Sequence, residues 1–159
     1  PSHDNTIELQ LPFIRYFFGE IPILAIGTPP SETAVDIAKT VVAGARELGL
    51  DLKIIGSTDL THYGPNYGFT PHGKGAAAAA WVKAENDRRF IDAALGLNPE
   101  IVLGEALRHQ NACCAGAAAA TIQSALDLGA SQGVLMAYTT SYDKIPGDSF
   151  VGYAGIAYC

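Results

Sequence analysis

The sequence has no long apolar run, few basic residues and few cysteines, and these shortages exclude several classes of protein. Gly, Pro or a charged residue interrupts every apolar stretch before it reaches the roughly 18 residues that a membrane-spanning helix needs. Lys and Arg number 10 against 16 Asp and Glu, which gives a net charge of −6. A nucleic-acid surface would need clustered cations. We therefore expect neither a membrane nor a nucleic acid among the partners of this chain.

The three cysteines do not suit a disulfide framework. Cys113 and Cys114 are adjacent, and Cys159 is the last residue. Adjacent cysteines rarely pair with each other, so reduced thiols and a cytoplasmic location are expected. With 159 residues, of which 48 % are hydrophobic, the chain suffices for a single domain, residues 1–159, with its own core. The first residues, from Pro1 onward, resemble an internal segment of a protein. We therefore expect this sequence to be the C-terminal part of a longer chain.

Apolar periodicity predicts helices and strands that alternate along most of the chain. The helices are expected at residues 11–18, 32–48, 76–95, from 99 onward, and 115–128. The strands are expected at residues 22–26, 52–55, 134–138 and 150–158. Such alternation favours an α/β fold, here a three-layer α/β/α sandwich with a mixed, mainly parallel sheet. The last two strands have no helix between them and are expected to form an antiparallel edge.

The most informative stretch follows the strand expected at 52–55 and runs from Gly56 to Gly64. In open α/β sheets, ligands bind in the crevice beyond the strand ends. Asp59 and His62 lie three residues apart, close enough for the carboxylate to orient the imidazole as a general acid–base or as a metal ligand. The alternative is a polar turn in which Asp59 caps a loop, and spacing alone leaves both open.

Two further polar clusters stand beside expected helix starts. Residues 2–8 hold His3, Asn5 and Glu8, which either cap the following helix or contribute to a site at a strand end. Cys113 precedes the helix expected at 115–128, where the helix dipole favours a thiolate. Free cysteines are often small buried hydrophobic residues, so that alternative stays open as well.

Strand ends and helix starts can converge on one edge of an α/β sheet, so a single crevice is predicted there. Asp59 and His62 are its candidate catalytic residues, and Cys113 and His3 are further polar side chains expected in its lining. The expected binding-pocket residues are Asn5, Glu8, Ser57 and Tyr63. No phosphate-binding loop, dinucleotide fingerprint or nucleophile elbow in the sequence competes with this crevice.

Five motifs occur in order along the chain: NTIELQLPF at 5–13, GSTDLTHYG at 56–64, AC at 112–113, YTTS at 138–141 and SFVGYA at 149–154. Together they resemble the Memo-like family, also called protein B of the AmmeMemoRadiSam system. The resemblance covers essentially the whole chain, so residues 1–159 are expected to form one Memo-like domain. The family is similar to the class III extradiol dioxygenases, whose non-haem iron is held by two histidines and a carboxylate.

The resemblance implies a metal site at the sheet edge, made of an upstream histidine, a histidine near position 5 and a cysteine. The residues that match this site and its surroundings are Glu8, Asp59, His62 and Cys113. Asn5 stands at the histidine position, and an amide is a poor ligand beside a thiolate. The site is therefore expected to hold Fe(II), another divalent transition metal or no metal, with His3 as the remaining candidate ligand of that segment.

Three functions are open on these grounds. The first, which the resemblance favours, is a Memo-like protein of unidentified activity with a dioxygenase-type crevice, acting with radical-SAM and AMMECR1-like partner proteins. The second is an extradiol-type dioxygenase that depends on non-haem iron. The third is a non-enzymatic protein that binds a peptide or a small ligand in the crevice.

Overall fold

Helices make up most of the regular structure in the computed structural model of this chain, which describes residues 5–159. The longer helices are α2 (Leu11–Phe18), α3 (Thr33–Glu47), α5 (Asp87–Leu95), α6 (Pro99–His109) and α7 (Ala115–Asp127). The shorter ones are α1 (Asn5–Glu8), α4 (Gly75–Trp81) and α8 (Ser141–Lys144), with a 3₁₀ turn at Pro65–Tyr67 and a π turn at Val82–Asn86. The strands are β1 (His62–Tyr63), β2 (Gly133–Thr140) and β3 (Phe150–Tyr158). Within residues 5–159, no helix is both long and apolar enough to cross a membrane.

Local sequence signals explain where the helices begin. Pro12 lies in the first turn of α2, where its missing N–H costs no hydrogen bond. The Asn98 side-chain oxygen accepts hydrogen bonds from the backbone N–H groups of Glu100 and Ile101 at 3.1 and 3.0 Å, and thereby caps α6. The helices predicted at 11–18, at 32–48, from 99 and at 115–128 are confirmed to within a residue or so.

The three strands form an antiparallel sheet in the order β1-β3-β2. Strand β2 pairs with β3 over nearly its whole length, from Gly133 opposite Tyr158 to Thr140 opposite Gly152. This pairing confirms the predicted antiparallel edge. The broad α/β class is confirmed as well, but the three-layer sandwich with a mainly parallel sheet is not, because every pairing among the described strands is antiparallel.

The strands predicted at residues 22–26 and 52–55 are wrong, since both segments lie outside any helix or strand. A strand needs a neighbour to accept its backbone hydrogen bonds. One edge of β3 is paired with β2 and the other with the two-residue β1, and neither predicted segment pairs with any of these strands. Their apolar side chains stay in contact with water: Leu24 is 77 % exposed and Ile55 is 53 % exposed.

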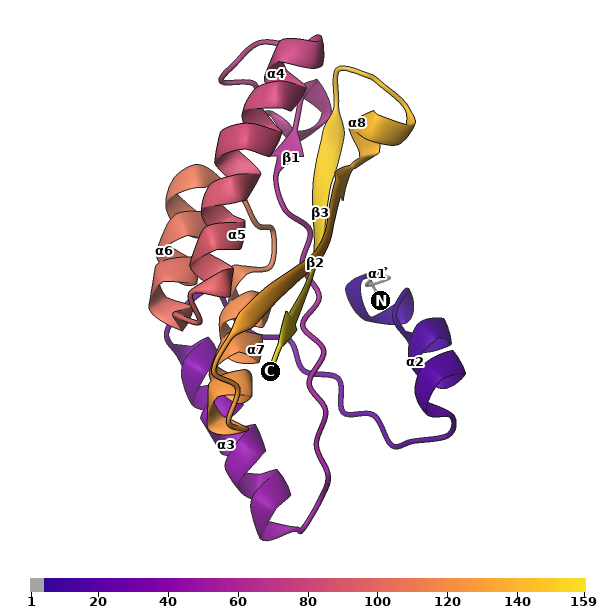
Figure 1. Cartoon of the computed structure of the whole chain (residues 1–159), viewed down its shortest axis with the longest axis vertical. Coiled ribbons are helices and arrows are strands. Elements are labelled where there is room, and N and C mark those ends of the chain that lie inside the picture. Colours follow the sequence, from indigo (N-terminus) through magenta and orange to yellow (C-terminus); the bar gives the residue numbers. More distant parts are fainter. Residues whose placement is uncertain (1–4) are drawn as a thin grey trace.

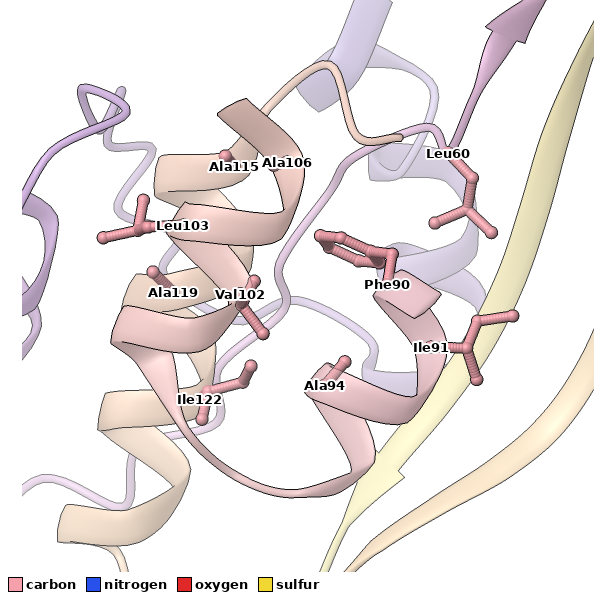
Figure 2. Close-up of a cluster of buried hydrophobic side chains, with 10 residues drawn as sticks. All are labelled: Leu60, Phe90, Ile91, Ala94, Val102, Leu103, Ala106, Ala115, Ala119 and Ile122. Atoms are coloured by element: carbon pink, nitrogen blue, oxygen red, sulfur yellow. The ribbon is translucent and has the colours of Figure 1, made fainter. Parts of the chain in front are cut away.

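The hydrophobic core lies between the sheet and the helices α5, α6 and α7. Figure 1 shows α4 to α7 on one side of β2 and β3, with α1 and α2 on the other side. Phe90 of α5, Val102 of α6 and Ile122 of α7 belong to one buried cluster, and Ile91 of the same cluster points from α5 toward a strand (Figure 2). Burial of a side chain of this size stabilises the fold by about 1.5–3 kcal/mol. Leu60 also belongs to this cluster, so the core anchors the chain directly before β1.

A second apolar cluster fixes β1 against β3 and α4. Tyr63 is fully buried, and its ring stacks on Phe150 with centroids 5.1 Å apart. The Tyr63 hydroxyl donates a hydrogen bond to the carbonyl of Gly73 at 3.1 Å and accepts one from the backbone N–H of His72 at 2.9 Å. The short strand β1 is thus held by packing and by two side-chain hydrogen bonds as well as by its own ladder.

Helix α5 contacts the sheet tightly at Gly152 of β3. A Cβ atom at this position would overlap the carboxylate of Asp87, the first residue of α5. Asp87 is 0 % exposed, so its side chain has no open space into which to withdraw. Glycine is therefore required at position 152 by the packing of helix on strand.

We predict that Gly152→Ala lowers the free energy of unfolding by about 3 kcal/mol, the upper end of typical overpacking costs. Urea unfolding followed by the fluorescence of the single tryptophan, Trp81, measures the change. The matched control is Gly155→Ala on the same strand, where a Cβ would meet Met136 Cβ at an ordinary 4.0 Å. Equal effects of the two substitutions would contradict the tight contact at Gly152.

Candidate functional site

The segment that carries Asp59 and His62 is fixed to β3 by two backbone hydrogen bonds. Leu60 N–H donates to the Gly152 carbonyl at 2.9 Å, and Gly152 N–H donates to the Thr61 carbonyl at 3.1 Å. Asp59 Oδ2 lies 3.2 Å from His62 Nε2, so the contact expected from their spacing is present. Both side chains are partly exposed, His62 by 34 % and Asp59 by 46 %, which leaves them accessible to a ligand.

The loop between α6 and α7 brings Cys113 to the same place. Cys113 N–H donates to the backbone carbonyl of Asp59 at 3.1 Å. Cys114 N–H donates to Thr58 Oγ1 at 3.0 Å, and the same hydroxyl lies 3.8 Å from Cys113 Sγ. Thr58, which sequence reasoning passed over, therefore joins the two segments. As expected, Cys113 stands just before α7, and it is exposed.

Asp59, His62 and Cys113 form a group that could hold a metal ion. A carboxylate oxygen, a ring nitrogen and the sulfur all lie within 4.8 Å of one another. The mixed oxygen, nitrogen and sulfur donors suit a divalent transition metal better than Mg²⁺ or Ca²⁺, which prefer oxygen alone. Tetrahedral ligands with bonds of about 2.0–2.3 Å lie roughly 3.5 Å apart, so the three donors would draw slightly closer around an ion and leave its fourth position open.

The remaining predicted site residues are not part of this group. Glu8 is exposed on α1, outside the set of mutually close donor atoms. Tyr63 is buried in the aromatic cluster, where its hydroxyl anchors the following loop. Ser57 is half-buried next to Thr58, whose hydroxyl makes the contacts. Asn5 begins α1, but its side chain lies outside the described part of the chain, as does the whole of His3.

A buried carboxylate lies directly behind the strand end. Asp87 Oδ1 accepts a hydrogen bond from the backbone N–H of Thr61 at 3.0 Å, and Asp87 Oδ2 accepts one from the Tyr138 hydroxyl at 2.7 Å. Burial raises the pKa of Asp87 above its usual value, although these hydrogen bonds oppose the shift. Burial and then the adjacent carboxylate raise the pKa of Tyr138, so this hydroxyl remains a donor.

Two buried asparagines connect this carboxylate to the cysteine loop. Asn86 Nδ2 donates to Thr61 Oγ1 at 2.9 Å and to the His109 carbonyl at 3.1 Å. Asn111 Nδ2 donates in turn to the Asn86 carbonyl at 3.0 Å. The network thus ties the Asp59–His62 segment to the loop that leads into Cys113.

The sequence analysis did not identify this network, because Asn86 and Asp87 lie inside the helix predicted at 76–95. Asn86 and Asp87 precede Phe90 by four and three residues, which places them on the buried face of that helix. Two polar residues on the buried face of a predicted helix would have indicated a buried hydrogen-bond network. The π turn at Val82–Asn86 interrupts the helix where this polar pair begins.

These features define a helix-and-sheet protein with a mixed-donor site where the chain enters a sheet. The family model described as Memo-like protein matches residues 2–157, and the chain belongs to this family. A MEMO1 family protein of Thermococcus onnurineus is 34 % identical over 167 residues, which cover 99 % of this chain and 57 % of that relative. A MEMO1 family protein of Methanopyrus kandleri is 32 % identical over 164 residues, which cover 99 % of this chain and 52 % of the relative. The chain spans about half the length of the curated relatives it matches.

The raised pKa of Asp87 predicts a specific pH dependence of stability. A carboxyl whose pKa is higher in the folded state stabilises the fold below its unfolded pKa of about 4 and loses that contribution as the pH rises. The contribution of Asp87 to the free energy of unfolding should therefore fall as the pH rises above about 4, and Asp87→Asn should remove that part of the slope. The pKa of Asp143 is lowered to about 2, chiefly by a hydrogen bond from Lys83. Asp143 therefore changes the free energy of unfolding only below about pH 4.

Urea unfolding at a series of pH values measures this dependence. The control is Asp92→Asn on the same helix, because Asp92 is about half exposed and is paired with Arg88. That variant should keep the wild-type slope. An unchanged slope in Asp87→Asn would show that the buried carboxyl does not titrate as described.

Proposed function

We propose that the protein binds one divalent transition-metal ion, such as Fe(II), through Asp59, His62 and Cys113. The observation that carries this proposal is the gathering of three different donor atoms within 4.8 Å, from segments about fifty residues apart in the sequence. Such an ion supplies Lewis-acid or one-electron redox chemistry at an open coordination position. Asn5 is not required in this arrangement, because Cys113 and Asp59 supply the ligands beside His62.

The chain's own residues would orient the metal-binding side chains at this site. The carboxylate of Asp59 holds one ring nitrogen of His62 and thereby fixes the tautomer and the direction of the imidazole. With one nitrogen held in this way, the other is left to bind the metal ion. Thr58 lies against the Cys113 sulfur and limits how far the thiolate can turn away.

A second candidate is the extradiol-type dioxygenase, with the same metal used to cleave an aromatic ring with O₂. Its support is the resemblance stated above together with the carboxylate–histidine pair. Fe(II)-loaded protein mixed with catechol and O₂ should produce the ring-cleaved product, and His62→Ala should abolish it. If the wild-type protein binds iron but cleaves no catechol, this candidate is excluded while metal binding stands.

We further propose, from the resemblance alone, that the whole protein acts with radical-SAM and AMMECR1-like partners on a small molecule or a peptide. Co-purification of the tagged, family-length protein with such partners tests this. Failure to recover either partner would weigh against that role and leave the metal proposal unaffected.

Metal binding is tested by anaerobic titration with Co(II). Wild-type protein should bind one equivalent and show the intense near-ultraviolet absorption of a cobalt–thiolate bond. Cys113→Ser should remove this absorption, and His62→Ala should weaken binding by more than the roughly 10- to 100-fold that loss of a supporting residue costs.

The matched control for this titration is Cys159→Ser, because Cys159 is also an exposed free cysteine but lies outside the metal group. It should leave both the affinity and the absorption unchanged. Thiolate absorption that survives in Cys113→Ser, or that depends on Cys159, would overturn the assignment.

A further inference from the structure

A cavity of about 340 Å³ opens beside the proposed metal group, with His62 and Cys113 in its wall. The other walls are formed mainly by apolar side chains of the loop after β1 and of α6, among them Phe69, Ala106 and Leu107. We propose that this cavity binds a small, uncharged and mainly apolar molecule, with one polar group directed to Gln110 and one end at the metal group. As an assignment of the substrate pocket, this proposal rests on the proposed function.

The charge of the lining supports an uncharged ligand. Among the residues that the structure describes, the lining contains no Lys, Arg, Asp or Glu, and its readily ionisable groups are those of His62 and Cys113. A charged group placed against apolar walls pays a desolvation cost that needs a partner of opposite charge. Asp59 adds negative charge at the same end, which disfavours an anion, and its carboxylate is already paired with His62 and is therefore not a free partner for a cation.

The exposed apolar surface supports a mainly apolar ligand. Leu107 is 62 % exposed and Tyr67 is 46 % exposed, although both lie in the wall of the cavity. The Tyr67 ring also lies beside the His62 ring, with centroids 4.8 Å apart. A molecule that covers these surfaces removes apolar area from water, which is favourable. The volume lies near the lower end of the roughly 300–1,000 Å³ typical of ligand cavities, so one ring or a short chain fits best.

Gln110 is an exposed residue that lines the cavity. It follows α6 in a left-handed conformation, with φ of 51° and ψ of 38°, and its backbone N–H donates to the Ala106 carbonyl. Glycine or asparagine usually occupies this helix-end conformation, and other residues adopt it at a cost of about 1–2 kcal/mol. Glutamine at this position supplies both a donor and an acceptor for one polar group of a ligand.

Three probes of the same size test the proposal: benzyl alcohol, benzoate and benzylamine. They share a ring and differ in charge. In two-dimensional NMR spectra of metal-free protein, benzyl alcohol should shift the signals of residues 60–69 and 106–113 and bind with a millimolar Kd. The two charged probes should bind at least about tenfold more weakly. Equal binding of all three, no binding of benzyl alcohol, or shifts confined to other residues would overturn the proposal.

Two pairs of variants connect the binding to this cavity. Leu107→Ser should weaken benzyl alcohol binding several-fold, whereas Leu48→Ser should not, because Leu48 is similarly exposed, at 74 %, but lies outside the cavity. Gln110→Gly keeps the backbone conformation and removes the amide, so it should weaken binding, while Gln110→Asn should retain most of it. Identical affinities within either pair would contradict the role given to that residue.

The outcome for the cavity is independent of the outcome for the metal. Because the spectra are recorded without metal, benzyl alcohol binding in a protein that fails the Co(II) titration would leave a ligand pocket and remove the metal proposal. Co(II) binding in a protein that does not bind benzyl alcohol would support the metal site and exclude the proposed ligand pocket.

Discussion

The pairing of the Thr61 backbone inside the protein is the constraint on which the candidate site depends. Its N–H donates to Asp87 at 3.0 Å, its carbonyl accepts from Gly152 N–H at 3.1 Å, and its hydroxyl accepts from Asn86 at 2.9 Å. Thr61 is 0 % exposed, so each bond acts in a low-dielectric interior where its loss is costly. Because Thr61 directly precedes His62, this pairing sets where the imidazole and its Asp59 partner emerge.

The site therefore has two layers with different physical character. Asp59, His62 and Cys113 are at least partly open to solvent, as ligand-binding groups must be. Behind them, Asn86, Asp87 and Asn111 are almost wholly buried and bonded to the backbone of both segments that carry the donors. Functional groups held by a buried, hydrogen-bonded support keep their geometry without a bound ligand. The fold also accommodates this support physically, since only glycine at position 152 leaves room for the Asp87 carboxylate.

The sequence was sufficient to predict the features that local chemistry decides. The start of α6 after Asn98 and the β2–β3 pairing could be derived from short-range patterns, whereas the spacing of Asp59 and His62 allowed their contact without deciding it. The apolar runs at 22–26 and 52–55 resemble strands equally well, but strand formation depends on a partner elsewhere in the chain, which no local pattern reveals. The same limit applies to Asp87, whose role depends on contacts with Thr61 and Tyr138, residues 26 and 51 positions away.

The central claim is that the support brings Asp59, His62 and Cys113 to one metal ion. The most direct measurement is X-ray absorption of the chain loaded with one equivalent of zinc under reducing conditions. The account predicts a coordination shell with one sulfur at about 2.3 Å and nitrogen and oxygen atoms, including one imidazole, at about 2.0–2.2 Å. A shell without sulfur, or one with two or more sulfurs, would contradict it.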